Sequence, residues 1–291
     1  MKLFADTADM EDIIYSFQRG VNSGITTNPK ILESTGDLSE GLENACKRIL
    51  REYPDAPVSL ETDLGGIETV EELLSTPYLE IRDRIVSQGR RLASWGENVY
   101  VKIPFCEGGI QATRILSDEG VKTNVTATMD SAQALEAANA GATVTNIFVN
   151  RRLDYEVLRL AGYKVSMVLS DPSQWKEIVS ENKERFNGEA WEIVLRDMSY
   201  AAKQLDRNGT DLIGASIRDP TDVHRMAKAG PQIITIPTPI LRKLGDIKGL
   251  RETKRSVSYV APVGADIPIY RNPMTLKTIL DFENAANTYR T

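Results

Sequence analysis

Eight short runs of strand-forming residues recur along the 291-residue chain, with segments of helical periodicity between them. Several of these segments end in glycine after a basic or small residue, as helix C-termini do. Strands that alternate with helices predict a parallel sheet. The count of eight favours a single (β/α)8 TIM barrel over an open doubly wound sheet, and no glycine-rich dinucleotide fingerprint follows the first run. The runs cover residues 2–7, 24–28, 57–62, 98–104, 122–128, 142–149, 211–217 and 232–237.

Two stretches fall outside this alternation, and we interpret them as insertions after strand six and near the C-terminus. The first, about 163–207, begins with a strand-like run at 164–170 and continues as a long helical pattern. The second, about 244–271, ends in a segment punctuated by proline and glycine, which predicts a structured loop or short hairpin rather than a helix. An amphipathic C-terminal helix is expected over 273–289. We therefore expect one barrel domain over residues 1–291.

Composition and charge limit the partners. The formal net charge is −6, and this acidic balance argues against a nucleic-acid or anionic-membrane partner. No apolar run approaches the roughly 18 residues of a membrane span, and the N-terminal residues lack the apolar core of a signal peptide. Two cysteines cannot form the disulfide framework of a small secreted protein. A cytoplasmic location is the expectation.

The single histidine, His224, limits the chemistry further. It lies in a helical pattern, where we expect a surface or packing residue. Ser–His–Asp and Cys–His catalysis would both need this residue, and neither nucleophile motif accompanies it. A zinc site with several imidazoles is impossible, and no cysteine pair has ligand spacing. We expect neither a metal nor a cofactor.

Lys102 interrupts the strand-like run VYVKIP, although a lysine is almost never fully buried unless it is paired. Other runs also carry polar residues near their carboxyl ends, called late polar residues below. In a barrel the carboxyl ends of all strands meet at one face, where active sites lie. Each residue alone has a structural explanation, because threonines form strands well and arginines at strand ends are often exposed. The late polar residues are Asp6, Thr26, Thr27, Asn28, Ser59, Glu61, Asn124, Thr126, Asn146, Arg151, Ser216 and Arg218.

These residue types together allow Schiff-base chemistry. A desolvated lysine has a lowered pKa, and its neutral amine attacks a ketone to give an imine that acts as an electron sink. Carbon–carbon cleavage then needs a base and imine formation needs an acid, roles that Asp6 and Glu61 could divide. Arg151 and Arg218 could bind a phosphate. The same two carboxylates favour the charged lysine and so oppose the lowering of its pKa by desolvation. The sequence does not determine which of these two effects is larger.

At these residues the chain resembles the transaldolase family, which includes the fructose-6-phosphate aldolases. The matching motifs run in order along nearly the whole chain, outside the two insertions. The resemblance implies a class I aldol enzyme of carbohydrate metabolism and the pentose phosphate pathway. It also implies sugar phosphate substrates and a homo-oligomer. The motifs are FADTAD, GITTNP, VSLET, VYVKIP, EGGIQATRIL, NVTAT, QALEAANAGA, FVNR, LIGASIR and NPMTLKTILDF.

The resemblance also implies a role for each candidate residue. Lys102 would form the Schiff base, and Asp6 would act as the base at the substrate C4 hydroxyl. Glu61 and Thr126 would hold the water that carries protons at the imine carbon. Substrate contacts are expected from Asn28, Thr26, Asn124, Asn146 and Phe148, and phosphate contacts from Arg151, Ser216 and Arg218.

Two positions distinguish the subgroups. The aldolase branch usually has glutamine in place of Glu61 and tyrosine in place of Phe148, so this chain resembles the transaldolases. Asn146 and Ile147, within TNIFVNR, depart from the small residue and proline usual in the family. We expect a transferase that moves a dihydroxyacetone unit to an aldose. The alternatives are an aldolase-like lyase, a specialised member with another substrate, and a sugar-phosphate-binding barrel without activity.

Overall fold

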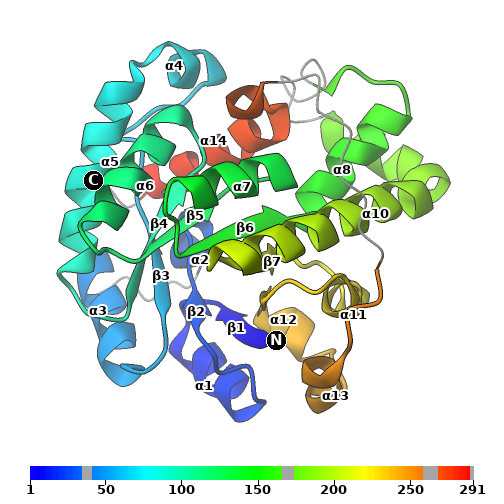
Figure 1. The fold of residues 1–291 in the computed structure, drawn as a ribbon, viewed down its shortest axis with the longest axis horizontal. Coiled ribbons are helices and arrows are strands. Elements are labelled where there is room, and N and C mark those ends of the chain that lie inside the picture. The colour runs from blue at the N-terminus through cyan, green and yellow to red at the C-terminus, as the bar shows by residue number, and fades with distance from the viewer. Residues whose placement is uncertain (35–40, 166–173, 258–267, 289–291) are drawn as a thin grey trace.

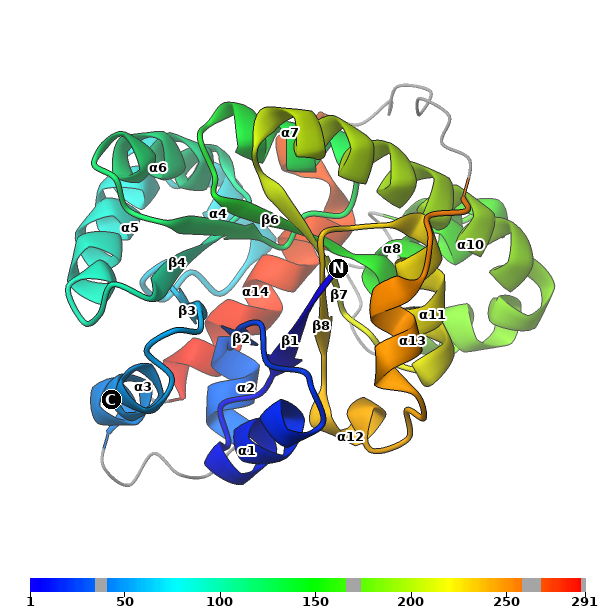
Figure 2. The same ribbon diagram turned by 60° about the horizontal axis from the view of Figure 1, so that its bottom comes forward.

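The computed structural model describes residues 1–34, 41–165, 174–257 and 268–288. Eight parallel strands close into a barrel in chain order, with β8 hydrogen-bonded to β1, and helices surround them (Figure 1, Figure 2). The prediction of a (β/α)8 barrel is confirmed, and every predicted strand position is occupied. The strands are β1 (Lys2–Asp6), β2 (Ile25–Thr26), β3 (Val58–Glu61), β4 (Val99–Pro104), β5 (Thr123–Thr126), β6 (Val144–Phe148), β7 (Asp211–Ala215) and β8 (Ile233–Ile236).

Helices follow the strands where the sequence supplies caps. Asp9 and Asp130 each accept a backbone N–H at a helix start, and Asp219 forms a capping box before Pro220. The described helices are α1 (Met10–Gln18), α2 (Pro29–Ser34), α3 (Leu42–Glu52), α4 (Val70–Ser75), α5 (Tyr78–Ala93), α6 (Glu107–Asp118), α7 (Ser131–Asn139), α8 (Val149–Leu160), α10 (Trp175–Asn208), α11 (Pro220–Ala229), α12 (Thr238–Leu241), α13 (Ile247–Glu252), η1 (Ile269–Arg271) and α14 (Pro273–Asn287).

Successive side chains of each strand point alternately toward the surrounding helices and into the barrel. Those that point toward the helices, such as Leu60, Val101 and Ile103, are buried in the hydrophobic layer between barrel and helices. The polar residues occupy the alternate positions, and the strand register pairs Glu61 with Lys102 and Lys102 with Asn124. Because successive side chains of a strand point to opposite faces, these polar groups share the barrel interior.

The first predicted insertion contains a 34-residue helix, α10, which packs along α8, α7 and β7. Buried Asp197 on α10 fixes this packing, because its carboxylate accepts from the backbone N–H of Ser131 at 3.0 Å and from the Ser131 hydroxyl. The strand-like run at 164–170 falls largely outside the described residues. His224 is exposed on α11, as predicted from its helical setting.

The second predicted insertion includes a helix that the sequence pattern missed. α13 is too short to show helical periodicity, but Asp246 caps it by accepting from the backbone of Lys248 and Gly249. Leu250 of this helix is buried, so α13 packs against the rest of the protein. Most of the predicted loop or hairpin before residue 271 lies outside the described residues.

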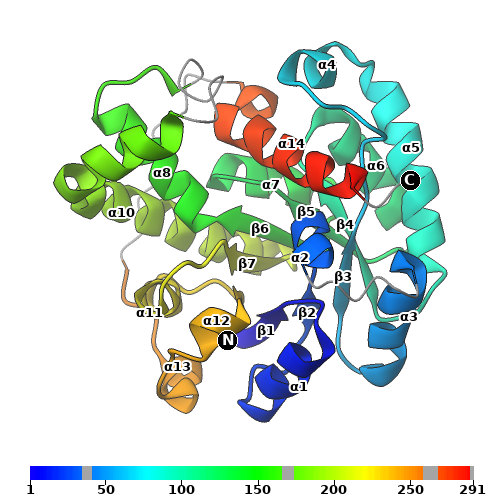
Figure 3. The ribbon, with the colours of Figure 1, turned by 180° about the vertical axis from the view of Figure 1, so that it is seen from behind.

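The predicted C-terminal helix is confirmed as α14, which lies across one face of the barrel. Figure 3 shows it with α2 below it and α4 above it. The buried carboxylate of Glu283 accepts from the backbone N–H groups of Leu64 (2.7 Å) and Gly66 (2.8 Å), which fixes α14 to the loop after β3. None of the helices in the described ranges combines the length and hydrophobicity needed to cross a bilayer.

Candidate active site

Lys102 lies inside the barrel near the carboxyl end of β4, where its side chain is 4% exposed. Its Nζ lies 3.0 Å from Glu61 Oε2 and donates to the backbone carbonyl of Thr27 at 2.9 Å. The ring of Phe282, from α14, lies 5.6 Å from the same nitrogen. The lysine tolerates burial because a carboxylate and a carbonyl replace the water that it loses.

Two carboxyl groups accompany the lysine, that of Asp6 and that of Glu61. Burial raises the pKa of Asp6, and the hydrogen bond from Thr26 (2.7 Å) and the charge of Lys102 oppose this only in part. Burial likewise raises the pKa of Glu61 against the charge of Lys102, and the nearby carboxylates of Glu283 and Asp6 raise it further. Both groups therefore exchange protons closer to neutrality than ordinary carboxyls, which suits acid–base catalysis.

A cavity of about 150 Å³ lies beside Lys102 and gathers most of the predicted site residues. A cavity of this size holds a molecule of about six heavy atoms, such as benzene. A short piece of a sugar therefore fits next to Nζ. The lining residues are Asp6, Thr26, Asn28, Lys102, Asn146, Phe148, Arg151, Ala215, Ser216, Thr235 and Phe282.

Four predicted site residues do not line this cavity, namely Glu61, Asn124, Thr126 and Arg218. Glu61 reaches the site through Lys102. Asn124 is fully buried, and its amide donates to Ser59 Oγ (2.9 Å) and accepts from Asn146, so it holds Asn146 in place. Thr126 is fully buried beside Pro104, and its hydroxyl has no hydrogen-bond partner within the described residues. A buried hydroxyl without a partner is rare and marks a place where a water molecule would bind.

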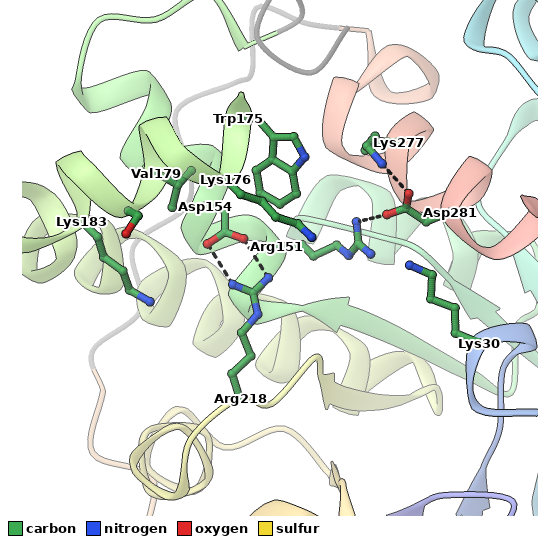
Figure 4. A pocket seen from close by; sticks show the side chains of 11 residues that line it. Lys30, Arg151, Asp154, Trp175, Lys176, Val179, Lys183, Arg218, Lys277 and Asp281 are labelled. Carbon is green, nitrogen blue, oxygen red and sulfur yellow. Dashed lines mark hydrogen bonds and ion pairs between the residues drawn. The ribbon is translucent and has the colours of Figure 1, made fainter. Parts of the chain in front are cut away.

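The predicted phosphate set is divided between this cavity and a larger cleft of about 510 Å³ (Figure 4). Arg151 lines both, Ser216 lines the inner cavity, and Arg218 lines the cleft. Arg218 makes a bidentate ion pair with Asp154 (3.0 and 2.8 Å), and Arg151 Nη1 lies 2.8 Å from Asp281.

The backbone turns sharply at Ser216, which has a left-handed φ of 64°. A non-glycine residue pays a steric cost there, and such strain is often found at functional sites. Asn150 stabilises the turn, since its amide donates to the Ser216 carbonyl (2.8 Å) and to Asp222 (2.7 Å). The turn directs Ser216 into the cavity and lets the chain continue to Arg218.

Sequence reasoning missed several residues of the site. Thr235 was detectable, because a search of the last strand for late polar residues finds it, and its hydroxyl lies 2.5 Å from that of Thr26. Phe282 and Asp281 gave no such signal, since the path of α14 over the barrel is not visible in its sequence. Lysines of the outer cleft were also missed, namely Lys30, Lys176, Lys183 and Lys277.

Comparison with known proteins agrees with the geometry. Residues 3–289 match the family model described as Transaldolase/Fructose-6-phosphate aldolase. A probable transaldolase of Clostridium botulinum (strain Hall) is 33% identical over 242 residues, 83% of this chain and 87% of the relative. A probable transaldolase of Clostridium perfringens (strain 13) is 33% identical over 84% of this chain and 89% of its own. One from Herpetosiphon aurantiacus is 32% identical over 84% and 87%.

Proposed function

The chain belongs to the transaldolase/fructose-6-phosphate aldolase family, and from this premise we propose that it transfers a dihydroxyacetone unit from a ketose phosphate to an aldose or aldose phosphate. The reaction proceeds through a Schiff base on Lys102. The observation that carries the proposal is the setting of this lysine. Its Nζ lies between Glu61 and the Thr27 carbonyl, beside a cavity that Asp6 also lines.

In the first step, the neutral amine of Lys102 attacks the C2 carbonyl of the ketose, and the resulting carbinolamine loses water to form the imine. The leaving hydroxide needs a proton. Glu61 supplies it through a water molecule held with Thr126. The raised pKa of Glu61 supports this role, and the unpartnered Thr126 hydroxyl supports a water in that position.

In the second step, Asp6 takes the proton of the C4 hydroxyl and the C3–C4 bond breaks. The bonding electrons move into the imine, which leaves an enamine on Lys102 and releases an aldehyde. The acceptor aldehyde then reacts with the enamine carbon, and Asp6 returns its proton to the new hydroxyl. Hydrolysis of the new imine frees the product ketose and the lysine.

The rest of the cavity binds the substrate. Asn28, Thr26 and Asn146 supply hydrogen-bonding groups for its hydroxyls, and Asn124 keeps Asn146 oriented. The phosphate is held by Arg151, Ser216 and Arg218 through charge-assisted bonds. A guanidinium has five N–H donors, so Arg151 and Arg218 can bind a phosphate while they remain paired with Asp281 and Asp154.

Transfer requires that water does not protonate the enamine before the acceptor arrives. Phe148 and Phe282 support this requirement, because their rings pack edge to face with centroids 6.0 Å apart at the cavity wall. Membership of the family further supports carbohydrate metabolism of the pentose phosphate type, a cytoplasmic location and a homo-oligomer as parts of the proposal.

Borohydride reduction in the presence of a ketose phosphate, followed by peptide mass mapping, tests the proposal. We expect a reduced adduct on the peptide that contains Lys102 and none in Lys102→Met. Product should appear only when an aldose acceptor is present. Absence of an adduct with every ketose phosphate tried would refute the Schiff base, and free dihydroxyacetone without acceptor would identify a lyase instead.

A further inference from the structure

The outer cleft carries far more positive charge than one phosphate requires. Among the residues that the structure describes, six cationic side chains and two carboxylates line it, which leaves an excess of four positive charges (Figure 4). The other described lining residues are uncharged. The cations are Lys30, Arg151, Lys176, Lys183, Arg218 and Lys277, and the carboxylates belong to Asp154 and Asp281.

The excess lies on lysines rather than on the arginines. Asp154 compensates Arg218, and Asp281 is shared between Arg151 and Lys277. Lys30, Lys176 and Lys183 have no carboxylate within ion-pair distance in the part of the chain that the structure describes. Figure 4 shows Lys30 and Lys183 at opposite ends of the cleft, with the two arginines between them.

Helix α10 carries two of these lysines on the same face. Lys176 and Lys183 are seven residues apart, which places them on the same helix face at about 10 Å along the axis. Val179 and Ser180, the residues between them on that face, also line the cleft. The lysines therefore form a row along one wall. They lie within residues 163–207, outside the motifs that this chain shares with its family.

Mutual repulsion makes this cluster costly without an anion. Partial burial lowers the pKa of Lys30; the charge of Asp281 opposes this, and the charges of Arg151, Lys277 and Lys176 lower the pKa further. A phosphoryl group brings about −1.5 to −2 charges at pH 7. One phosphate therefore compensates at most about half of the excess.

We infer that the cleft is a second phosphoryl-binding subsite, formed by Lys176 and Lys183, that acts beside the one at Arg151 and Ser216. Its ligand is a second phosphoryl group, either on the same sugar or as a separate phosphate ion. The cleft volume of about 510 Å³ lies in the range of small-molecule sites and exceeds what a single phosphate fills. The inference rests on the proposed function for the position of the first phosphate.

Calorimetric titration with inorganic phosphate and with pyrophosphate tests the inference directly. We expect wild-type protein to bind pyrophosphate at least tenfold more tightly than phosphate. The double variant Lys176→Met/Lys183→Met should lose at least tenfold in pyrophosphate affinity, and its phosphate affinity should stay within threefold. Lys102→Met should bind both probes like wild type, so this result is independent of the Schiff base.

Matched variants separate a local site from a general charge effect. Lys228→Met removes one charge from the exposed face of α11, outside the cleft, and should change neither affinity. Lys176→Arg/Lys183→Arg should restore pyrophosphate binding. Equal affinity for the two probes in wild type, or a parallel loss of both in the double Met variant, would overturn the inference.

The source of the second phosphoryl group follows from borohydride trapping with a ketose monophosphate and added inorganic phosphate. An increase in adduct identifies a separate phosphate ion that binds together with the sugar. A decrease identifies competition, and the two phosphoryl groups then belong to one ligand. If trapping fails altogether while pyrophosphate selectivity holds, the proposed function is wrong and the second subsite stands.

Discussion

Lys102 combines two requirements that oppose each other. Its partners, the Glu61 carboxylate at 3.0 Å and the Thr27 carbonyl at 2.9 Å, stabilise an ammonium ion in a buried place. Attack on a ketone requires the neutral amine. The raised pKa of Glu61 offers a resolution, because a proton that passes from Nζ to this carboxyl leaves a neutral pair inside the barrel. In the proposed mechanism, the lysine and Glu61 therefore share one proton.

Asp6 provides the first prediction at this scale. As a base it must be ionised, and burial raises its pKa above the ordinary value of 3.8. The kcat/KM profile should therefore fall on the acid side at a higher pH than an exposed aspartate would give. Asp6→Asn should lower kcat by about 10²- to 10⁴-fold and still form the Lys102 adduct. Steady-state rates across pH and borohydride trapping measure both effects.

The thermal stability of Asp6→Asn shows whether a loss of activity comes from the missing base or from unfolding of the protein. A carboxyl whose pKa is raised by folding stabilises the protein below its unfolded pKa, and this contribution is lost as the pH rises through the folded pKa. Asp6→Asn should thus have a Tm at pH 8 equal to or above that of wild type. The exposed Asp55→Asn serves as control. Full activity of Asp6→Asn would contradict the assignment.

Glu61 and Phe148 provide the second prediction, since the resemblance to the family implies that these two positions distinguish transferases from lyases. A tyrosine hydroxyl at position 148 would stand in the cavity beside Phe282 and could bind water near the enamine. Glu61→Gln/Phe148→Tyr should raise the ratio of dihydroxyacetone release to transfer by about tenfold, or ~1.4 kcal/mol in relative barriers. Chromatography of products with and without acceptor measures this ratio. An unchanged ratio shows that these positions do not set it.

At the scale of elements, α14 completes a site that the strands begin. It brings Phe282 to Lys102 and Asp281 to Arg151, and Glu283 fixes it to the loop after β3. The amphipathic pattern predicts this helix and its apolar face. The pattern does not reveal what that face packs against, because many surfaces satisfy the same periodicity. The contributions of α14 to the site therefore required the structure.

The third prediction concerns this attachment. Glu283→Ala removes the acceptor of two backbone N–H groups, those of buried Leu64 and of Gly66, and should lower the free energy of unfolding by about 2–4 kcal/mol. Glu283→Gln keeps one acceptor oxygen and should lose less. Chemical denaturation measures both variants. The KM for the ketose phosphate should rise in Glu283→Ala as Asp281 and Phe282 lose their fixed position, and an unaltered KM would argue against this role of α14.

At the scale of the whole molecule, the architecture of the barrel determines which parts of the site can be predicted from the sequence. Polar residues late in the strands share one face in any closed parallel barrel, so Asp6, Lys102 and Asn146 could be predicted together. The cleft is different, because its cations come from α2, α8, α10, α14 and the loop after β7, far apart in the chain. Arg151 and Arg218 follow strands and could be predicted together as phosphate ligands, whereas the four lysines are scattered among thirty-five lysines and arginines. Only the packing of helices outside the barrel brings these lysines together.

The fourth prediction follows from this uneven distribution of charge. The net charge of −6 repels anionic substrates at long range, and the excess positive charge in the cleft attracts them at short range. Raising the ionic strength from about 10 mM to about 100 mM shortens the Debye length from about 30 Å to about 10 Å, which screens the exposed lysines more than the buried site.

The KM for a ketose phosphate should therefore rise by about three- to tenfold over this range, with little change in kcat, because Lys102 is almost fully buried. Trapping of neutral dihydroxyacetone on Lys102 is the internal control and should not respond to salt. Lys228→Met should retain the wild-type salt dependence, and Lys176→Met/Lys183→Met should reduce it. An equal response of the phosphorylated and neutral ligands would mean that salt acts on the fold and not on the cleft.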